Sequence, residues 1–404
     1  MKKLLAALLL VSSLGKAEAV EFHVAGYGDL RTFLPSSERS WVDGGLGKTR
    51  FGSEYPTPSV FAAGLVDVTA VIFPGLSFSA VAQVAPTQKV FVDFIEAFGR
   101  YRPVSTNAWR YTVKGGAFFA PISLENTDIG WTSPWTLTPS AINTWVGEEF
   151  RTIGGEGTID WRNERRTLSF TASAFGWNDP AGILLADRGW ALNDRITGFA
   201  DHLKLPDAFA IGRRQTIPQR TLMFHEIDNK IGWYAGAAWE EKGIGKIQVL
   251  RYDNESNPTK SRTQTSWETT FWSVGAQTQI GNVTLITQGM IGDTFIRPSA
   301  TSFSDTNYES AFLLVGWELG TDWRLAARVD YFGTQERRPA GGRAPFSEHG
   351  NALTFAVNYL PNDWLRITGE VLRIDSTRTQ RTILGDPAKA EETQFQLNFR
   401  SYLP

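Results

Sequence analysis

The feature that most constrains this chain is an alternation of apolar and other residues that recurs along its whole length. Every second residue is apolar from Leu76 to Val84, from Thr167 to Ala174 and from Leu353 to Tyr359. A period of two gives a β-strand one apolar and one polar face. Soluble sandwiches contain such strands too, so the number and spacing of the segments must decide between the two architectures.

Sixteen segments of this kind are expected. They lie near 20–33, 59–73, 75–85, 90–102, 108–119, 149–162, 166–177, 230–241, 245–253, 266–280, 282–293, 307–319, 323–333, 350–361, 364–376 and 393–403. Bacterial outer-membrane barrels have an even number of antiparallel strands with this dyad pattern. The sequence therefore predicts an all-β fold, a transmembrane antiparallel barrel of about 16 strands, with residues 20–404 as one domain.

The connectors between these segments alternate in length. Short turns such as Pro74-Gly75 and Gly281-Asn282 follow the even-numbered segments. Long connectors follow the odd-numbered ones, at 34–58, 120–148, 178–229, 254–265, 294–306, 334–349 and 377–392, and only the link at 86–89 is short where a long one is expected. Short periplasmic turns and long extracellular loops are typical of outer-membrane barrels. Both chain ends are then expected on the periplasmic side.

The first 19 residues form a separate unit. Lys2 and Lys3 precede an apolar run from Leu4 to Leu14, and Ala17-Glu18-Ala19 supplies small residues at a cleavage site. This arrangement predicts a secretory signal peptide at 1–19. The alternative, a membrane anchor, is disfavoured because the run is too short to span a hydrocarbon core of roughly 30 Å.

Composition narrows the possibilities further. The chain has no cysteine, which excludes disulfides and thiolate metal sites, and no later apolar run is long enough for a transmembrane helix. The 40 basic and 42 acidic residues nearly balance, which argues against nucleic acid as a partner. No cofactor is expected. Many aromatic residues and 38 glycines fit strands that face lipid on one side and water on the other.

Aromatic residues gather beside the short turns on the face assigned outward. They are Tyr101, Trp109, Tyr111, Trp161, Trp239, Trp317, Trp323 and Tyr359. Rings at one level predict an interfacial girdle in a bacterial outer membrane of phospholipid and lipopolysaccharide. The same phase places Leu168 and Phe355 toward lipid, whereas Thr167 and Thr354 face the lumen and should tolerate arginine.

Sixteen strands are enough to enclose an aqueous lumen. The polar faces then form the channel wall, and we expect about half of their charges to pair across strands. The candidate lining residues are Asp29, Arg31, Glu96, Arg100, Lys114, Arg328 and Asp330.

The connector 120–148 differs from a loop in bulk solvent. It is rich in tryptophan and proline, it contains Glu125 and Asp128 but no lysine or arginine, and Ser140 can cap a short helix. Such a loop is expected to fold inward as a constriction, opposite the strand that carries Arg328. Two interpretations stay open. The acids and Arg328 face each other across water and set up a transverse field, or Glu125 pins the loop to the wall.

The connector 178–229 is long but too apolar for disorder. A short helix is expected from about Trp190 to Leu203, and the loop should fold over or into the channel mouth.

The order and spacing of the segments resemble 16-stranded bacterial porins, whose third extracellular loop folds inward. Within residues 90–125, the stretches Val92–Phe98 and Gly115–Glu125 are similar to segments of the phosphate-selective porin family. The resemblance implies a homotrimer. Phosphate selectivity does not follow, because the constriction loop of this chain lacks the lysines that the family places in its channel.

A passive diffusion channel for small hydrophilic solutes or ions is the favoured function, and no enzymatic activity is expected. A barrel enzyme is the alternative from another class, but no G-x-S-x-G elbow occurs and the four histidines have no telling spacing to serine or aspartate. A transporter of hydrophobic compounds is the remaining alternative. Ion conductance in planar bilayers discriminates between these functions.

Overall fold

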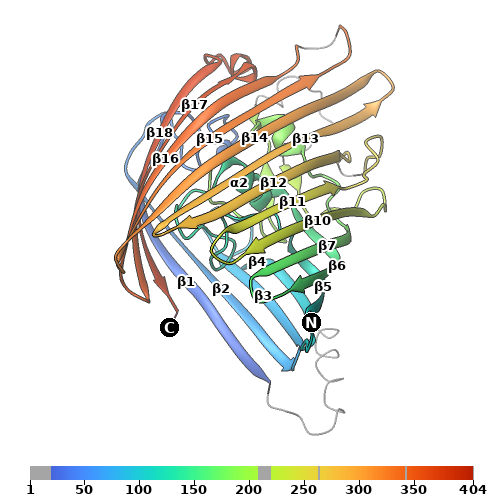
Figure 1. Ribbon diagram of the computed structural model, residues 1–404. Helices are drawn as coiled ribbons and strands as arrows, with labels where there is room; N and C mark the ends of the chain where they lie inside the picture. Colours follow the sequence, from blue (N-terminus) through green and yellow to red (C-terminus); the bar gives the residue numbers. More distant parts are fainter. Residues whose placement is uncertain (1–19, 208–219, 263, 342–343, 404) are drawn as a thin grey trace.

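The computed structural model describes residues 20–207, 220–262, 264–341 and 344–403. Sixteen antiparallel strands close into one barrel in which each strand pairs with its sequence neighbours and β1 pairs with β18 (Figure 1). The predicted fold class is confirmed. The signal peptide expected at 1–19 lies outside the described residues. Within the described part of the chain, no helix combines the length and apolarity needed to cross a bilayer.

The barrel strands are β1 (Glu21–Leu34), β2 (Ser59–Phe73), β3 (Leu76–Val84), β4 (Asp93–Tyr101), β5 (Trp109–Phe119), β6 (Arg151–Arg162), β7 (Arg166–Gly176), β10 (Gly232–Glu241), β11 (Gly245–Asp253), β12 (Glu268–Ile280), β13 (Val283–Ser299), β14 (Ser302–Leu319), β15 (Trp323–Arg337), β16 (Ser347–Asn362), β17 (Leu365–Arg378) and β18 (Lys389–Tyr402). The remaining elements are β8 (His202–Lys204), β9 (Arg220–Leu222), α2 (Ala141–Glu149), α3 (Ile183–Arg188), η2 (Trp41–Asp43) and η3 (Thr379–Leu384). Each of the sixteen expected segments corresponds to one barrel strand.

The prediction of a long loop at 294–306 is wrong. The alternation continues beyond Asp293, so β13 and β14 extend to Ser299 and Ser302 and leave only a tight turn where 294–306 was expected. The long strands, with 13 to 18 residues, are accordingly β1, β2 and β12 to β18, whereas β3 to β7, β10 and β11 have nine to 12. The barrel therefore has a tall wall and a short wall (Figure 1).

The two faces of the strands follow the predicted phase. On β16, the Phe355 side chain is 49% exposed on the outside, while neighbouring Thr354 is fully buried on the inside. The girdle residues Trp323 and Tyr359 pair across β15 and β16, with ring centroids 4.6 Å apart. Outward apolar side chains with inward polar ones are the arrangement that a lipid environment requires.

Both described chain ends lie at the end of the barrel that carries the short turns. Glu21 at the start of β1 is paired with Val71, just before the turn at Gly75, and Tyr402 near the end of β18 is paired with Tyr27. The long connectors all lie at the opposite end. Connectors 120–148 and 178–229 fold into the barrel, and connector 34–58 packs against them through the fully buried Lys48, which donates to Arg188 O.

The loop 178–229 contains a short helix and a small hairpin, but not where the helix was expected. The helix α3 ends at Arg188, because Gly189 turns into a left-handed conformation with φ 79°. Residues 190–201 have no helix, and β8 pairs with β9 as a separate two-stranded sheet. Residues 208–219 of this loop lie outside the described part of the chain.

Candidate functional site: a loop network and a charged slot in the lumen

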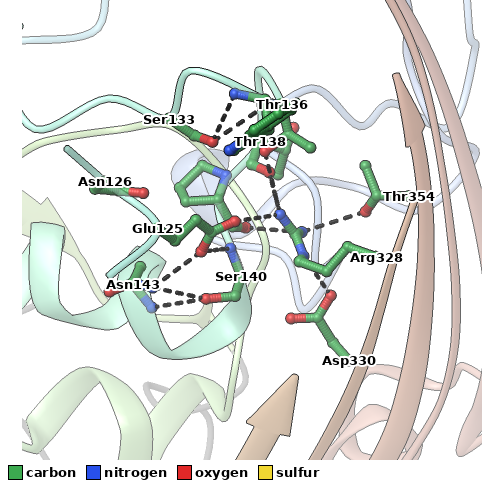
Figure 2. Close-up of polar contacts among 12 residues, drawn as sticks. Glu125, Asn126, Ser133, Thr136, Thr138, Ser140, Asn143, Arg328, Asp330 and Thr354 are labelled. Atoms are coloured by element: carbon green, nitrogen blue, oxygen red, sulfur yellow. Dashed lines mark hydrogen bonds and ion pairs between the residues drawn. The ribbon is translucent and has the colours of Figure 1, made fainter. Parts of the chain in front are cut away.

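The constriction loop, residues 120–148, crosses the barrel to the far wall. It leaves β5 and reaches β15, which is eight strands away from β5 in either direction around the barrel. There Arg328 Nη1 donates to Glu125 Oε1 at 2.7 Å, and Arg328 Nε donates to Asp330 Oδ2 at 2.7 Å (Figure 2). All three side chains have no exposed area. The loop is thus fixed by a buried network of charges.

The local structure of the loop explains where these charges lie. Ser140 caps α2 by accepting a hydrogen bond from Asn143 N, as expected from the sequence. Glu125 Oε2 accepts hydrogen bonds from Ser140 N and Asn143 Nδ2, both at 2.9 Å, and Asp330 Oδ1 accepts one from Ala141 N. Two carboxylates therefore satisfy free amides at the start of α2, where the helix dipole favours negative charge.

Further contacts fasten the loop to neighbouring strands of the tall wall. Glu370 on β17 accepts hydrogen bonds from the backbone amides of Leu137 and Thr138 at 2.6 and 3.1 Å. The Trp135 ring lies against Gly316 on β14, where an added Cβ would come within 2.5 Å of ring carbons. The wall therefore offers polar anchors and a recess that only glycine leaves open.

These contacts correct the expectation of a transverse field between separated charges. Glu125 and Arg328 form a direct buried ion pair, so the interpretation of Glu125 as a strut is the one that fits. The expectation that Thr354 tolerates arginine is corrected as well. The Thr354 hydroxyl accepts a hydrogen bond from Arg328 Nη2 at 3.2 Å, so this fully buried position has no room for a second guanidinium.

The long loop is locked onto the constriction loop. Arg188 Nη2 and Glu148 Oε2 form an ion pair of 2.7 Å, and both side chains are fully buried. Asn193 Nδ2 donates to Glu148, while Thr144 Oγ1 donates to Asn193 O. Glu149 accepts hydrogen bonds from Gly182 N and Leu184 N at the start of α3. The two loops consequently form one unit inside the barrel.

Glu149 is the titratable group at this junction. Burial raises the pKa of Glu149 to about 7, although hydrogen bonds from Leu184 N and the Trp145 indole lower it in part. Its charge state therefore changes near neutral pH, which makes the contact between the two loops sensitive to pH.

The two loops leave a narrow cavity beside β1, β2 and β3, which we call the slot. It is bounded by β1, β2 and β3, by Thr132 and Leu137 of the constriction loop, by residues 194–196 and Asp201 of the long loop, and by Arg50. Its free volume is about 50 Å³, enough for a few water molecules. It reaches from Thr87 and Gln88, in the connector between β3 and β4, to Tyr27 and Gly64 inside the barrel.

Several ion pairs lie along the slot. Asp194 contacts Arg31 and Arg50 at 2.8 and 2.9 Å, Asp29 contacts Arg400 at 2.8 Å, and a further pair joins Arg195 to Asp201 at 2.7 Å. Four guanidinium groups thus accompany three carboxylates. Burial alone would raise the pKa of Asp194, but Arg31 and Arg50 outweigh it and hold the pKa below its usual range. Asp194 therefore stays ionised in mildly acidic solution.

The remaining candidate residues lie on the lumen side but do not meet at one point. Lys114 pairs with Glu156 at 3.0 Å, and Glu96 accepts a hydrogen bond from Phe119 N. Arg100 is exposed beside Lys114 on the neighbouring strand. Asp128 lies 3.4 Å from Arg366. Of the predicted set, the structure brings Glu125, Arg328 and Asp330 together in the network, and Asp29 and Arg31 together at the slot.

A second cavity lies on the opposite side of the lumen. It holds about 220 Å³ beneath Pro121 and is lined by inward side chains of β6, β7, β10 and β11, including Glu156, Gln248 and Lys246. Phe150 and Tyr252 belong to a buried cluster of aromatic residues, and their ring centroids lie 5.0 Å apart. The slot is the narrower of the two cavities.

One acidic group could coordinate a metal ion by its spacing. Carboxylate oxygens of Asp179, Glu226 and Asp228 lie within 4.8 Å of one another. Burial raises the pKa of Asp179 to about 6; the hydrogen bond from Ile227 N lowers the pKa in part, and the carboxylates of Glu226 and Asp228 raise it further. Asp179 Oδ2 already accepts hydrogen bonds from Ile227 N and Asp228 N, so this carboxylate connects the two ends of the long loop.

The sequence did not lead us to most of the charged residues at the slot. Arg400 lies on the polar face of the last expected strand, so the alternation could have revealed it. Arg50, Asp194 and Arg195 come from connectors, where no periodicity shows the direction of a side chain.

Comparisons with known proteins agree with this geometry at the level of the fold. No protein-family model matches the chain, and no curated protein matches its sequence. Among solved structures, the outer membrane channel DcaP of Acinetobacter baumannii is similar with a TM-score of 0.52 and 9% identity, over 95% of this chain and 97% of that one. A loop-deletion mutant of OmpT, an outer membrane protein of Vibrio cholerae, has a TM-score of 0.51 and 11% identity, over 95% and 99%.

OmpT of Vibrio cholerae folded in vitro is also similar, with a TM-score of 0.50 and 11% identity over 97% of this chain and all of that one. Identities this low concern the fold alone. The chain has the fold of a 16-stranded, porin-like outer-membrane β-barrel. The similarity of residues 90–125 to phosphate-selective porins finds no counterpart in these comparisons.

Proposed function

We propose that this protein is an outer-membrane porin, a passive diffusion channel for small hydrophilic solutes or ions. The observation that carries the proposal is the slot. An inward-folded loop narrows a barrel with a polar interior, yet it leaves a cavity that is lined by charged groups and holds a few water molecules. Barrels of about this strand number enclose an aqueous channel unless a plug fills them.

The proposal includes the environment of the channel. The barrel sits in a bacterial outer membrane of phospholipid and lipopolysaccharide, with the short turns and both chain ends in the periplasm, after removal of residues 1–19. It assembles as a homotrimer, as the porin resemblance implies. The resemblance to phosphate-selective porins contributes only the architecture of the inward loop.

A barrel enzyme has less support. His23 lies 3.4 Å from the exposed Glu21, and His202 Nε2 lies 3.0 Å from Lys89 Nζ rather than next to a serine. Neither arrangement activates a nucleophile.

Reconstitution in planar bilayers tests the channel directly. The purified, folded barrel should produce discrete conductance steps, and heat-unfolded protein should not. Steps in groups of three that are lost when the trimer is dissociated would support the trimer. A folded barrel without current above the bare membrane would contradict the proposed function.

A further inference from the structure

The outer face of the tall wall becomes polar well before its strands end. On β16 and β17, the three outward positions nearest the extracellular end are polar. They are Asn351, His349 and Ser347 on β16, and Arg373, Asp375 and Thr377 on β17. Strands β14 and β18 show the same change. On β4 and β10, by contrast, the outward residue nearest that end is apolar, Phe94 or Trp233, so only the tall wall has this polar extension among these strands.

The polar extension is taller than the head group of a phospholipid. Three outward positions on a strand correspond to about six residues. At a rise of about 3.3 Å per residue and a tilt of about 45°, these residues add roughly 14 Å of height. Phospholipid head groups add only about 5–7 Å on each side of the hydrocarbon core. A lipid that covers the extension consequently needs a larger head group, such as one built from sugars.

A groove crosses the outer face where the apolar band meets the polar extension. It holds about 690 Å³. Leu313, Val329 and Leu353 lie side by side across β14, β15 and β16 and form its apolar part, where all three side chains are exposed. The next residue in the same row is Arg373 on β17. The groove therefore changes from hydrocarbon to charge along its length.

The polar part of the groove carries groups that suit sugars and phosphate. The Arg373 side chain is 55% exposed, and it contacts Glu391 at 2.8 Å and Asp375 at 3.6 Å. Lys389 also contacts Glu391, so two cations accompany two carboxylates. Exposed ion pairs contribute little, and the guanidinium keeps donors for a phosphate, whose oxygens it binds well. Asn351, in the adjoining row, offers an amide donor and an acceptor for sugar hydroxyls.

We propose that this groove binds lipopolysaccharide, the phosphorylated glycolipid of the outer leaflet. An acyl chain lies over Leu313 and Val329, a phosphate on the sugar backbone meets Arg373, and the sugars cover the polar extension. A phospholipid fills the apolar part but leaves most of the extension uncovered. The inference rests on the proposed function, because it requires a barrel in the outer membrane. It goes further by assigning the outer face of β14 to β17 to a bound glycolipid.

The test is a binding measurement by native mass spectrometry on the purified, folded barrel in detergent. The ligands are a rough lipopolysaccharide, the same molecule after dephosphorylation, and phosphatidylglycerol. The wild-type barrel should bind the intact lipopolysaccharide several-fold more tightly than the other two. Arg373→Gln should lower this affinity to that for the dephosphorylated form, whereas Arg373→Lys should retain part of the difference. Ala311→Trp fills the groove from β14 and should weaken the binding of both forms of lipopolysaccharide several-fold.

Two variants outside the groove are matched controls. Arg297→Gln removes an exposed arginine at the extracellular end of β13, and Ala172→Trp adds the same bulk to the outer face of β7. Both should fold, as heat-modifiable gel mobility verifies, and both should bind like the wild type. Equal affinity of the wild type for lipopolysaccharide and phosphatidylglycerol, or equal affinities of Arg373→Gln and Arg297→Gln, would overturn the inference. Such a result with normal conductance leaves the channel function intact, whereas a folded barrel without conductance refutes the function itself.

Discussion

The loop anchor on the tall wall and the slot use the same chemistry for different ends. On the tall wall, Arg328 is surrounded by Glu125, Asp330 and loop carbonyls, and all of these side chains are shielded from water. At the slot, Arg50 and Arg31 share Asp194, whose side chain is 19% exposed. Buried pairs depend on every partner and therefore act as struts. Ion pairs that reach water are able to interact with a passing solute, so we expect them to influence the selectivity of the channel.

The largest expected effect comes from removing the central strut. Arg328→Met leaves Glu125 and Asp330 as uncompensated buried charges, and breaking such a pair costs about 3–5 kcal/mol. Urea unfolding monitored by heat-modifiable gel mobility measures the loss. Lys246→Met on the open side of the lumen should change stability little. Equal losses in the two variants would mean that the two walls do not differ as described.

Arginine substitutions on the outward face of β16 and on the inward faces of β16 and β7 compare the lipid-facing side of the wall with its lumen-facing side. Phe355→Arg places a charge in the lipid and should destabilise the barrel by about 2–4 kcal/mol near the midplane. Thr167→Arg faces the cavity beneath Pro121 and should be tolerated. Thr354→Arg also faces inward but should fail like Phe355→Arg, because Arg328 already fills the space. A tolerated Thr354→Arg would show that the tall wall is not sealed.

Alkaline pH should loosen the junction between the two loops. The folded pKa of Glu149 is about 7 and exceeds that of an ordinary glutamate, so its stabilising contribution is complete below about pH 4.5 and is lost as pH rises through 7. The expected loss is on the order of 1–3 kcal/mol between pH 5 and pH 8. Protease accessibility of the long loop at the two pH values measures it. Glu149→Gln should remove the pH dependence, and a dependence that survives would have another origin.

Filling the glycine recess should displace the loop with a smaller penalty. Gly316→Ala forces the Trp135 ring away from β14, and overpacking of this kind costs about 1–3 kcal/mol. Current noise and unfolding midpoints should both report the change. Gly289→Ala on β13, where nothing lies within 4 Å of an added Cβ, is the matched control. Identical behaviour of the two variants would contradict the close fit of loop and wall.

A smaller effect on stability than at Arg328 is expected at the slot. Asp194→Asn changes a side chain that is 19% exposed, whereas the partners of Arg328 are fully buried, so it should cost less than Arg328→Met. It also leaves Arg31 and Arg50 without their shared carboxylate, and the reversal potential in a salt gradient should shift toward anions. Because Arg31 and Arg50 hold the pKa of Asp194 low against its burial, wild-type selectivity should persist in mildly acidic solution. A large loss of stability without a change in selectivity would make Asp194 a strut as well.

The fold was largely predictable because strand faces obey a local period. The phase of Phe355 and Thr354, and the position of Arg328 opposite the constriction loop, follow from counting residues and strands. The distance between Glu125 and Arg328 does not, because it depends on how residues 120–148 turn inside the barrel. Arg50 and Asp194 lie more than 140 positions apart in the chain. Nothing in their local sequence predicts their meeting at the slot.

The pairing of Asp29 with Arg400 has a consequence for the order of assembly. These residues face each other across the seam between the first and last strands, so their bidentate contact exists only after the circle has closed. The ion pair of Glu125 and Arg328 also joins positions about 200 residues apart, and such distant contacts form late because they require closure of long loops. The inner loops therefore reach their final positions at the end of folding, and an incompletely closed barrel leaves Arg400 without Asp29 and Arg328 with Asp330 alone.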